Sequence, residues 1–202
     1  TDIKALILII LSVSISHAKP FVGISVGRFN GTDELHSGFI GGAEVGIEIK
    51  KTFLSLQGSH LQQEMRNGLD PSGSVTLLPL TLNLGGIWAK KPLSVRISGG
   101  VGVVLSDFQI SKEIEKRNKW SNETIGIDLD DGICYQIQGG IERRLNERTS
   151  IGFEVGYLIY ETLLRETRTT KIPYDLTMST IRETTAPFNF NSVIGKVVLR
   201  FR

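Results

Sequence analysis

The chain alternates apolar and polar residues in eight segments. The clearest lies at residues 93–105, LSVRISGGVGVVL. There Val95 and Ile97 share one parity, meaning that they occupy every second position, and Arg96 has the other parity. A repeat of two residues is the geometry of a β-strand with one apolar and one polar face. The segments that we predict as strands are 21–29, 39–50, 53–63, 75–88, 93–108, 132–142, 150–160 and 191–202.

The connections between these segments alternate between long and short. The long ones are NGTDELHS, MRNGLDPSGS and the stretches 109–131 and 164–188, and the short ones are KKT, AKKP and RLNER. Outer-membrane barrels have short turns at the periplasmic end and long loops outside. We therefore predict an all-β fold, an eight-stranded antiparallel up-and-down transmembrane β-barrel in a bacterial outer membrane, with both termini in the periplasm.

The direction of the apolar face decides between two kinds of barrel. In a secreted, soluble lipocalin-like barrel the apolar face lines the interior, and the surface that meets water is rich in Lys and Glu. Here the polar parity is mostly Gly, Ser, Thr, Asn and Gln. This composition favours a membrane barrel with the apolar face outward. The residues predicted to face lipid include Val45, Ile47, Leu80, Leu82, Val95, Ile97, Val155, Val197 and Leu199.

Charged residues of the polar parity are few and nearly balanced in sign. They are Glu44, Glu48, Arg96, Glu142, Glu154, Lys196 and Arg200. An eight-stranded barrel is only wide enough for its own side chains to fill. We expect these seven charges to pair into a structural plug rather than to line a conducting path. Cys134 has the same parity and is expected to be a small lumenal filler.

The first 18 residues have the pattern of a secretory signal peptide. Lys4 provides the positive flank, residues 5–15 are apolar, and Ser16 and Ala18 are the small residues before a cleavage site. The alternative is an uncleaved N-terminal anchor. We assign residues 1–18 to the signal peptide and residues 19–202 to the barrel domain.

The composition of the chain mainly excludes certain partners and kinds of site. The 202 residues carry a net charge of +2, and the charges are scattered, which argues against a nucleic-acid partner. One cysteine and three histidines allow neither a disulfide nor a zinc-type site. We expect no metal, no cofactor and a monomer whose partners are outer-membrane lipids and lipopolysaccharide.

Two charged clusters lie in the stretch 109–131. A basic cluster there suits simple charge pairing with lipid phosphates, and it consists of Lys112, Lys116, Arg117 and Lys119. The acidic run from Asp128 to Asp131 lacks the ligand spacing of a calcium loop, so we expect a solvated acidic turn.

A lipid-modifying enzyme is the second class of function to consider. An acyltransferase-like site would need a histidine with a serine and a carboxylate. His36, Asp70 and Ser72 lie in the first two long connections and are the candidates. Such residues are ordinary turn formers, so we assign no catalytic residue.

Two regions of the chain resemble a known family. The run LPLTLNLGGIW, the turn AKKP and the run LSVRISGGVGVV resemble the central strand–turn–strand of small eight-stranded outer-membrane barrels of the OmpW and OmpA-like superfamily, often called porin-family proteins. The ending FNFNSVIGKVVLRFR resembles their closing strand. The resemblance implies a structural or surface-interaction role, with minor channel activity or passage of small hydrophobic solutes. It also implies a C-terminal aromatic residue read by the barrel-assembly machinery, whereas Phe201 is followed here by Arg202.

Overall fold

The computed structural model describes residues 18–31, 37–67, 70–90, 92–120, 123–172 and 175–202. These residues form nine antiparallel strands and one helix. The elements are β1 (Lys19–Gly31), β2 (Gly38–Ile49), β3 (Thr52–Asn67), β4 (Asp70–Lys90), β5 (Leu93–Ile110), α2 (Lys112–Trp120), β6 (Glu123–Leu129), β7 (Gly132–Arg144), β8 (Thr149–Ile172) and β9 (Asp175–Phe201). Residues 1–17, which hold nearly all of the expected signal peptide, lie outside the described part.

Eight of the strands close into a barrel. Each of β1 to β4 pairs with the next strand, and the ring continues from β5 through β7 and β8 to β9. The pairing of β9 with β1, from Val22 opposite Phe201 onward, closes it. The ninth strand, β6, stands outside the ring and pairs only with β8, beyond Leu164. The predicted eight-stranded antiparallel barrel is confirmed.

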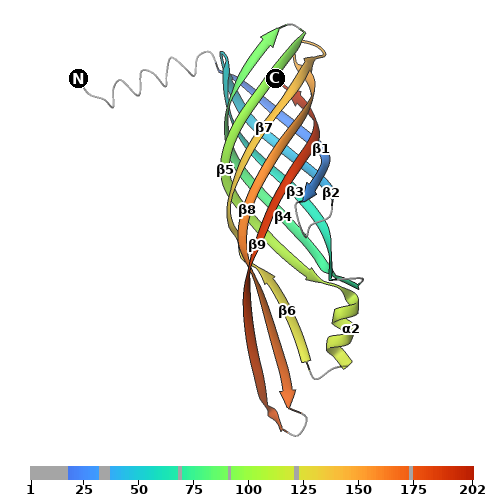
Figure 1. Cartoon of the computed structure of the whole chain (residues 1–202). Helices are drawn as coiled ribbons and strands as arrows, with labels where there is room; N and C mark the ends of the chain where they lie inside the picture. Colours follow the sequence, from blue (N-terminus) through green and yellow to red (C-terminus); the bar gives the residue numbers. More distant parts are fainter. Residues whose placement is uncertain (1–17, 32–36, 68–69, 91, 121–122, 173–174) are drawn as a thin grey trace, which may run out of the picture.

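The two ends of the barrel differ (Figure 1). At one end lie the C-terminus, the start of β1, the short connections 50–51 and 145–148, and the paired residues Lys90 and Leu93 of β4 and β5. We call this the turn end. The β8–β9 hairpin, β6 and α2 extend from the opposite end, which we call the loop end. In the described part of the chain, no helix is long and apolar enough to cross a membrane.

Several segments predicted as loops are regular structure. The stretch 164–188 continues the β8–β9 ladder as far as Ile172 opposite Asp175. The stretch 109–131 contains α2 and β6, and most of MRNGLDPSGS belongs to β3 and β4. These predictions were wrong. In the β8–β9 extension, residues 180–187 are exposed on both faces, so no apolar parity reveals the strand. Threonine-rich runs such as TRTT nevertheless have high β-propensity.

Inside the barrel, glycines let neighbouring backbones approach closely. Gly102 lies on the inward parity of β5, opposite Thr81 of β4. A Cβ atom at Gly102 would lie 2.0 Å from the carbonyl oxygen of Leu80. Gly99, on the outward parity of the same strand, would meet only the carbonyl oxygen of Gln136, at 3.9 Å. The two glycines therefore differ in the space that a side chain would find.

We expect Gly102→Ala to destabilise the barrel by about 1–3 kcal/mol, because the backbone of β4 must shift to accept the new methyl group. Gly99→Ala is the matched control and should leave stability nearly unchanged. Denaturant unfolding of the refolded protein in detergent measures both variants. Equal stability of the two would contradict the close β4–β5 approach.

Candidate functional site

The seven charges predicted for the lumen come together at its turn end. Arg200 of β9 lies at the centre of this charge layer and is almost fully buried. Its Nε donates to Glu44 at 3.0 Å, its Nη1 donates to Glu142 at 2.9 Å, and its Nη2 pairs with Glu154. Lys196 pairs with the other oxygen of Glu154 at 3.2 Å. One guanidinium therefore joins carboxylates from three different strands.

Arg96 of β5 makes the second centre of the charge layer. Its Nη1 lies 2.6 Å from Glu48 and 3.6 Å from Glu142. Its guanidinium also lies 4.0 Å from the centroid of the Phe53 ring and 5.0 Å from that of Phe21. Cation–π contacts of this kind are strongest where water is excluded, as it is around a guanidinium that is 3% exposed.

Arg202 is a member of this layer that the prediction missed. Its Nη2 donates to Glu48 at 2.9 Å and also to Glu142, and its Nη1 donates to Ser150 at 2.8 Å. Burial alone would lower the pKa of Arg202, but the hydrogen bonds with Glu48 and Glu142 raise it above its usual value. The charge layer thus holds four carboxylates and four cations. The parity of Lys196 and Arg200 already pointed to Arg202.

On the loop-end side of the charge layer lies a layer of amides and hydroxyls. Lys196 donates to Gln138 at 3.0 Å, and Gln138 accepts from Gln136 at 3.1 Å. Gln136 in turn accepts from Thr81 at 3.2 Å, and Thr81 accepts from Asn83 at 3.1 Å. This chain of hydrogen bonds crosses the lumen from β9 to β4 and connects the charge layer to the middle of the barrel.

The loop-end part of the lumen is filled by apolar side chains. They come from every barrel strand and from the end of β6, and the fully buried ones include Phe29, Leu61, Leu77, Val104, Cys134, Leu158, Tyr160 and Phe190. The rings of Phe29 and Phe190 have centroids 5.7 Å apart. This apolar layer packs as a protein core does, although it lies inside a barrel.

The acidic turn between β6 and β7 covers the apolar layer. Leu129 is 4% exposed and belongs to the buried cluster. Tyr160 donates its hydroxyl to the carbonyl oxygen of Asp130 at 2.7 Å, and the backbone N–H of Ser106 donates to Asp131 at 2.9 Å. The prediction of a solvated turn was therefore incomplete, because side chains of β5 and β8 fix it over the lumen.

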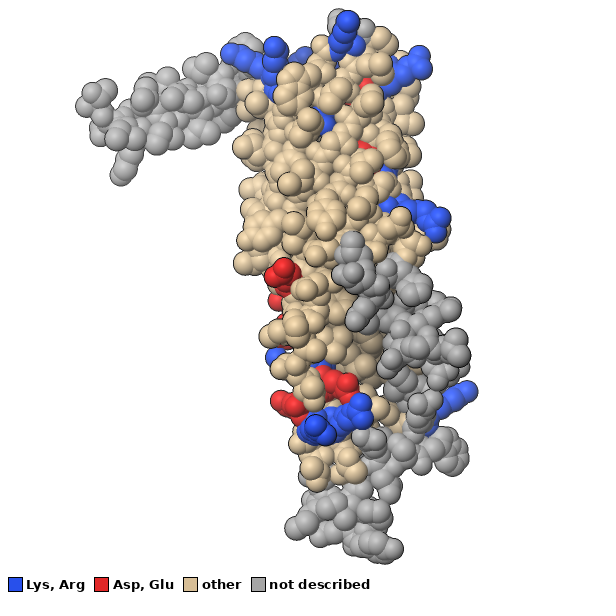
Figure 2. Space-filling view, in the orientation of Figure 1, with Lys and Arg blue, Asp and Glu red and all other residues tan. Residues whose placement is uncertain are grey.

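On the outside, the strands carry an apolar belt. The nine residues predicted to face lipid all lie on the outward parity, with Leu82 at 52% and Ile97 at 49% exposed. Figure 2 shows a largely uncharged surface below the Lys and Arg side chains at the turn end. Exposed basic residues at that end are Lys50, Lys51, Lys90, Arg143, Arg144 and Arg148. On the loop side, the belt ends at Arg28 on β1 and at His60 on β3.

Comparison with proteins of known structure identifies the fold. No family model and no curated protein sequence matches the chain. Among solved structures, the outer membrane protein OprG of Pseudomonas aeruginosa matches with a TM-score of 0.62 at 15% identity, covering 91% of this chain and 97% of OprG. Neisserial surface protein A matches with a TM-score of 0.59 at 10% identity, over 91% and 97% of the two chains. The chain has the fold of the small outer-membrane β-barrels. At these identities the likeness establishes the fold alone.

Several candidate residues of the sequence lie outside this barrel site. His36 is not among the described residues, and neither are the side chains of Asp70 and Ser72, so the acyltransferase candidates lie outside the described part of the structure. In the described part of the chain, no group of three His, Cys, Asp or Glu residues is arranged to hold a metal ion. Three residues of the basic cluster, Lys112, Lys116 and Lys119, lie exposed on α2 rather than in a loop.

If the belt meets lipid, a charge placed in it should be costly. We expect Ile97→Arg to lower the free energy of unfolding in bilayers by about 2–4 kcal/mol, the range for a midplane arginine on a barrel. Ile97→Leu is the control and should behave as wild type does. Unfolding in lipid vesicles measures both. Equal folding of Ile97→Arg and wild type would contradict the outward assignment.

Proposed function

We propose that this protein is a bacterial outer-membrane barrel that does not conduct ions and that carries a surface-interaction element at its loop end. The observation that carries the proposal is the combination of a filled lumen with an apolar outer belt. Its role is structural and interactive rather than enzymatic. Its lipid partners are those of the outer membrane.

The apolar belt supports the membrane location. Exposed apolar side chains follow one another along every barrel strand, with Val22, Val101, Ile137 and Phe153 all at least half exposed. A contiguous surface of this kind is far larger than the apolar patches of soluble monomers. In a bilayer this apolar surface meets lipid, so its exposure carries no hydrophobic cost. A closed barrel also satisfies its own backbone hydrogen bonds there.

The three layers of the lumen support the absence of a conducting path. An ion crossing the barrel would have to break the Arg200 ion pairs, displace the amide layer and then enter the apolar layer. Each step removes hydration or pairing from a charge, which costs several kcal/mol per ion. A small hydrophobic solute would meet the charge layer in the same lumen.

The β8–β9 hairpin supports a surface role. Residues 180–187 of β9 are exposed on both faces, and Ile181 is 62% exposed. This ribbon extends beyond the other strands of the barrel (Figure 1), so its polar and its few apolar side chains are available to a partner. We place the loop end outside the cell and the turn end in the periplasm.

Conductance in a planar bilayer tests the closed lumen. We expect wild type to show no steady openings, and Arg200→Met to conduct more or to unfold at lower denaturant, because it removes one partner from each of three buried carboxylates. Arg144→Met, at the exposed turn end, is the control. Stable ion-selective openings of the wild-type protein would overturn the closed barrel.

Labelling of intact cells tests the orientation. A cysteine at Glu183, in the hairpin, should react with a membrane-impermeant maleimide, whereas a cysteine at Glu147, in the turn after β7, should react only after lysis. Cys134 is fully buried and should stay unlabelled in both variants. The opposite pattern would invert the proposed orientation.

A further inference from the structure

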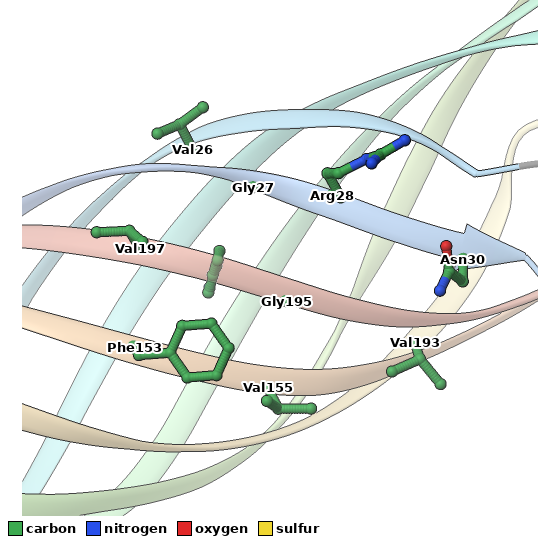
Figure 3. A pocket seen from close by; sticks show the side chains of 10 residues that line it. Val26, Gly27, Arg28, Asn30, Phe153, Val155, Val193, Gly195 and Val197 are labelled. Atoms are coloured by element: carbon green, nitrogen blue, oxygen red, sulfur yellow. The ribbon is translucent and has the colours of Figure 1, made fainter.

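A groove of about 440 Å³ lies on the outer surface where β1, β9 and β8 meet. Figure 3 shows it from close by, with Gly195 between the side chains of the neighbouring strands. Its walls are apolar and consist of Val26, Phe153, Val155, Val193 and Val197. The volume falls within the range of sites that hold small ligands. The groove lies in the apolar belt, so the molecules that reach it are lipids.

The groove exists because Gly195 has no side chain. The strand pairing sets Arg28, Gly195 and Val155 in one cross-strand row. A Cβ atom at Gly195 would meet only the ring of Phe153, at 3.9 Å, so a larger side chain fits there without strain. The gap is therefore a property of the sequence at this position rather than a requirement of the backbone.

Arg28 places a cation at the edge of this groove. The outward apolar run of β1 ends at Val26, and Arg28 and Asn30 follow toward the loop end. The Arg28 guanidinium lies 5.5 Å from the centroid of the exposed Phe39 ring. No carboxylate of the described residues pairs with it. A cation in this position favours the binding of an anion, and the planar guanidinium group of arginine matches the geometry of phosphate.

We propose that the groove binds an acyl chain of lipid A, the phosphorylated part of lipopolysaccharide, while Arg28 binds one of its phosphates. The apolar walls accept the chain, and Arg28 lies where the belt ends, at the level of headgroups. The choice of lipid A rests on the proposed function, which places the loop end outside the cell. Lipopolysaccharide is the phosphate-bearing lipid of that leaflet.

Two substitutions test the two halves of the site separately. Arg28→Gln removes the cation, and Gly195→Val fills the groove. The matched controls lie on strands that do not line the groove. Arg143→Gln, on β7, removes an exposed outward arginine at the turn end. Gly99→Val, on β5, adds a side chain to an outward glycine whose Cβ would meet its nearest atom at 3.9 Å.

The measurement is native mass spectrometry of the full protein, extracted from outer membranes in detergent and titrated with lipid A. We expect Arg28→Gln to weaken binding roughly tenfold or more, as the loss of a hydrogen-bonded charge does. Gly195→Val should weaken it as well. Lipid A without phosphates should bind wild type as weakly as lipid A binds Arg28→Gln. Both controls, Arg143→Gln and Gly99→Val, should match wild type.

Three results would overturn this site. Unchanged lipid A binding in either test variant would refute it, and so would an equal loss in the two control variants. Phosphatidylglycerol bound as tightly as lipid A, and lost equally with Arg28→Gln, would refute the choice of lipid A. The proposed function is tested by different measurements, which are bilayer conductance and cell labelling. If it fails, wild type conducts or the labelling pattern is inverted, while the binding of lipid A can remain intact.

Discussion

The narrow lumen of an eight-stranded barrel must be filled by its own side chains, and every charge among them must find a partner there. Strand alternation sends half of all residues into this space. In this chain the inward set includes four carboxylates, and four cations accompany them. Removing an ion from water costs several kcal/mol, so the charge layer is stable only while its pairs are complete. Arg200 is the residue on which this completeness depends most, because it contacts three of the four carboxylates.

The other layers follow from the same constraint. Lys196 belongs to the charge layer and also donates to Gln138, so the amide chain begins at an ion pair. Toward the loop end, Tyr160 packs in the apolar layer and donates its hydroxyl to the turn after β6. The lumen therefore changes from ionic to amide to apolar in one direction. A barrel filled in this way is a rigid anchor, and the β8–β9 hairpin extends from its apolar end.

The period-two pattern was enough to predict the barrel and most of its interior. Each barrel strand exposes a continuous apolar parity, so the strand cores and the seven lumenal charges could be placed from the sequence. The pattern could not extend β8 and β9 past the belt, because both faces of that ribbon are polar. It also missed Arg202, although the predicted strand 191–202 includes this residue and its parity is that of Arg200.

The groove at Gly195 shows a different limit. Parity places Gly195 on the outward face, but only the pairing of β9 with β1 and β8 brings it beside Arg28 and Phe153. A cross-strand row is a tertiary relation, and a single sequence does not give the register that creates it. The same reason hides the meeting of Glu44, Glu142 and Glu154 on one guanidinium, although each was placed in the lumen.

The central claim is that the outward parity meets lipid while the inward parity fills a closed lumen. Spin labels at Val95, Val101 and Asp107 of β5 test it most directly in reconstituted membranes. Molecular oxygen, which dissolves in lipid, should relax the label at Val101 strongly, and a water-soluble nickel chelate should not. The order should reverse at Asp107, beyond the belt. Nickel access at Val101 equal to that at Asp107 would contradict the claim, because it would show that the apolar parity does not meet lipid.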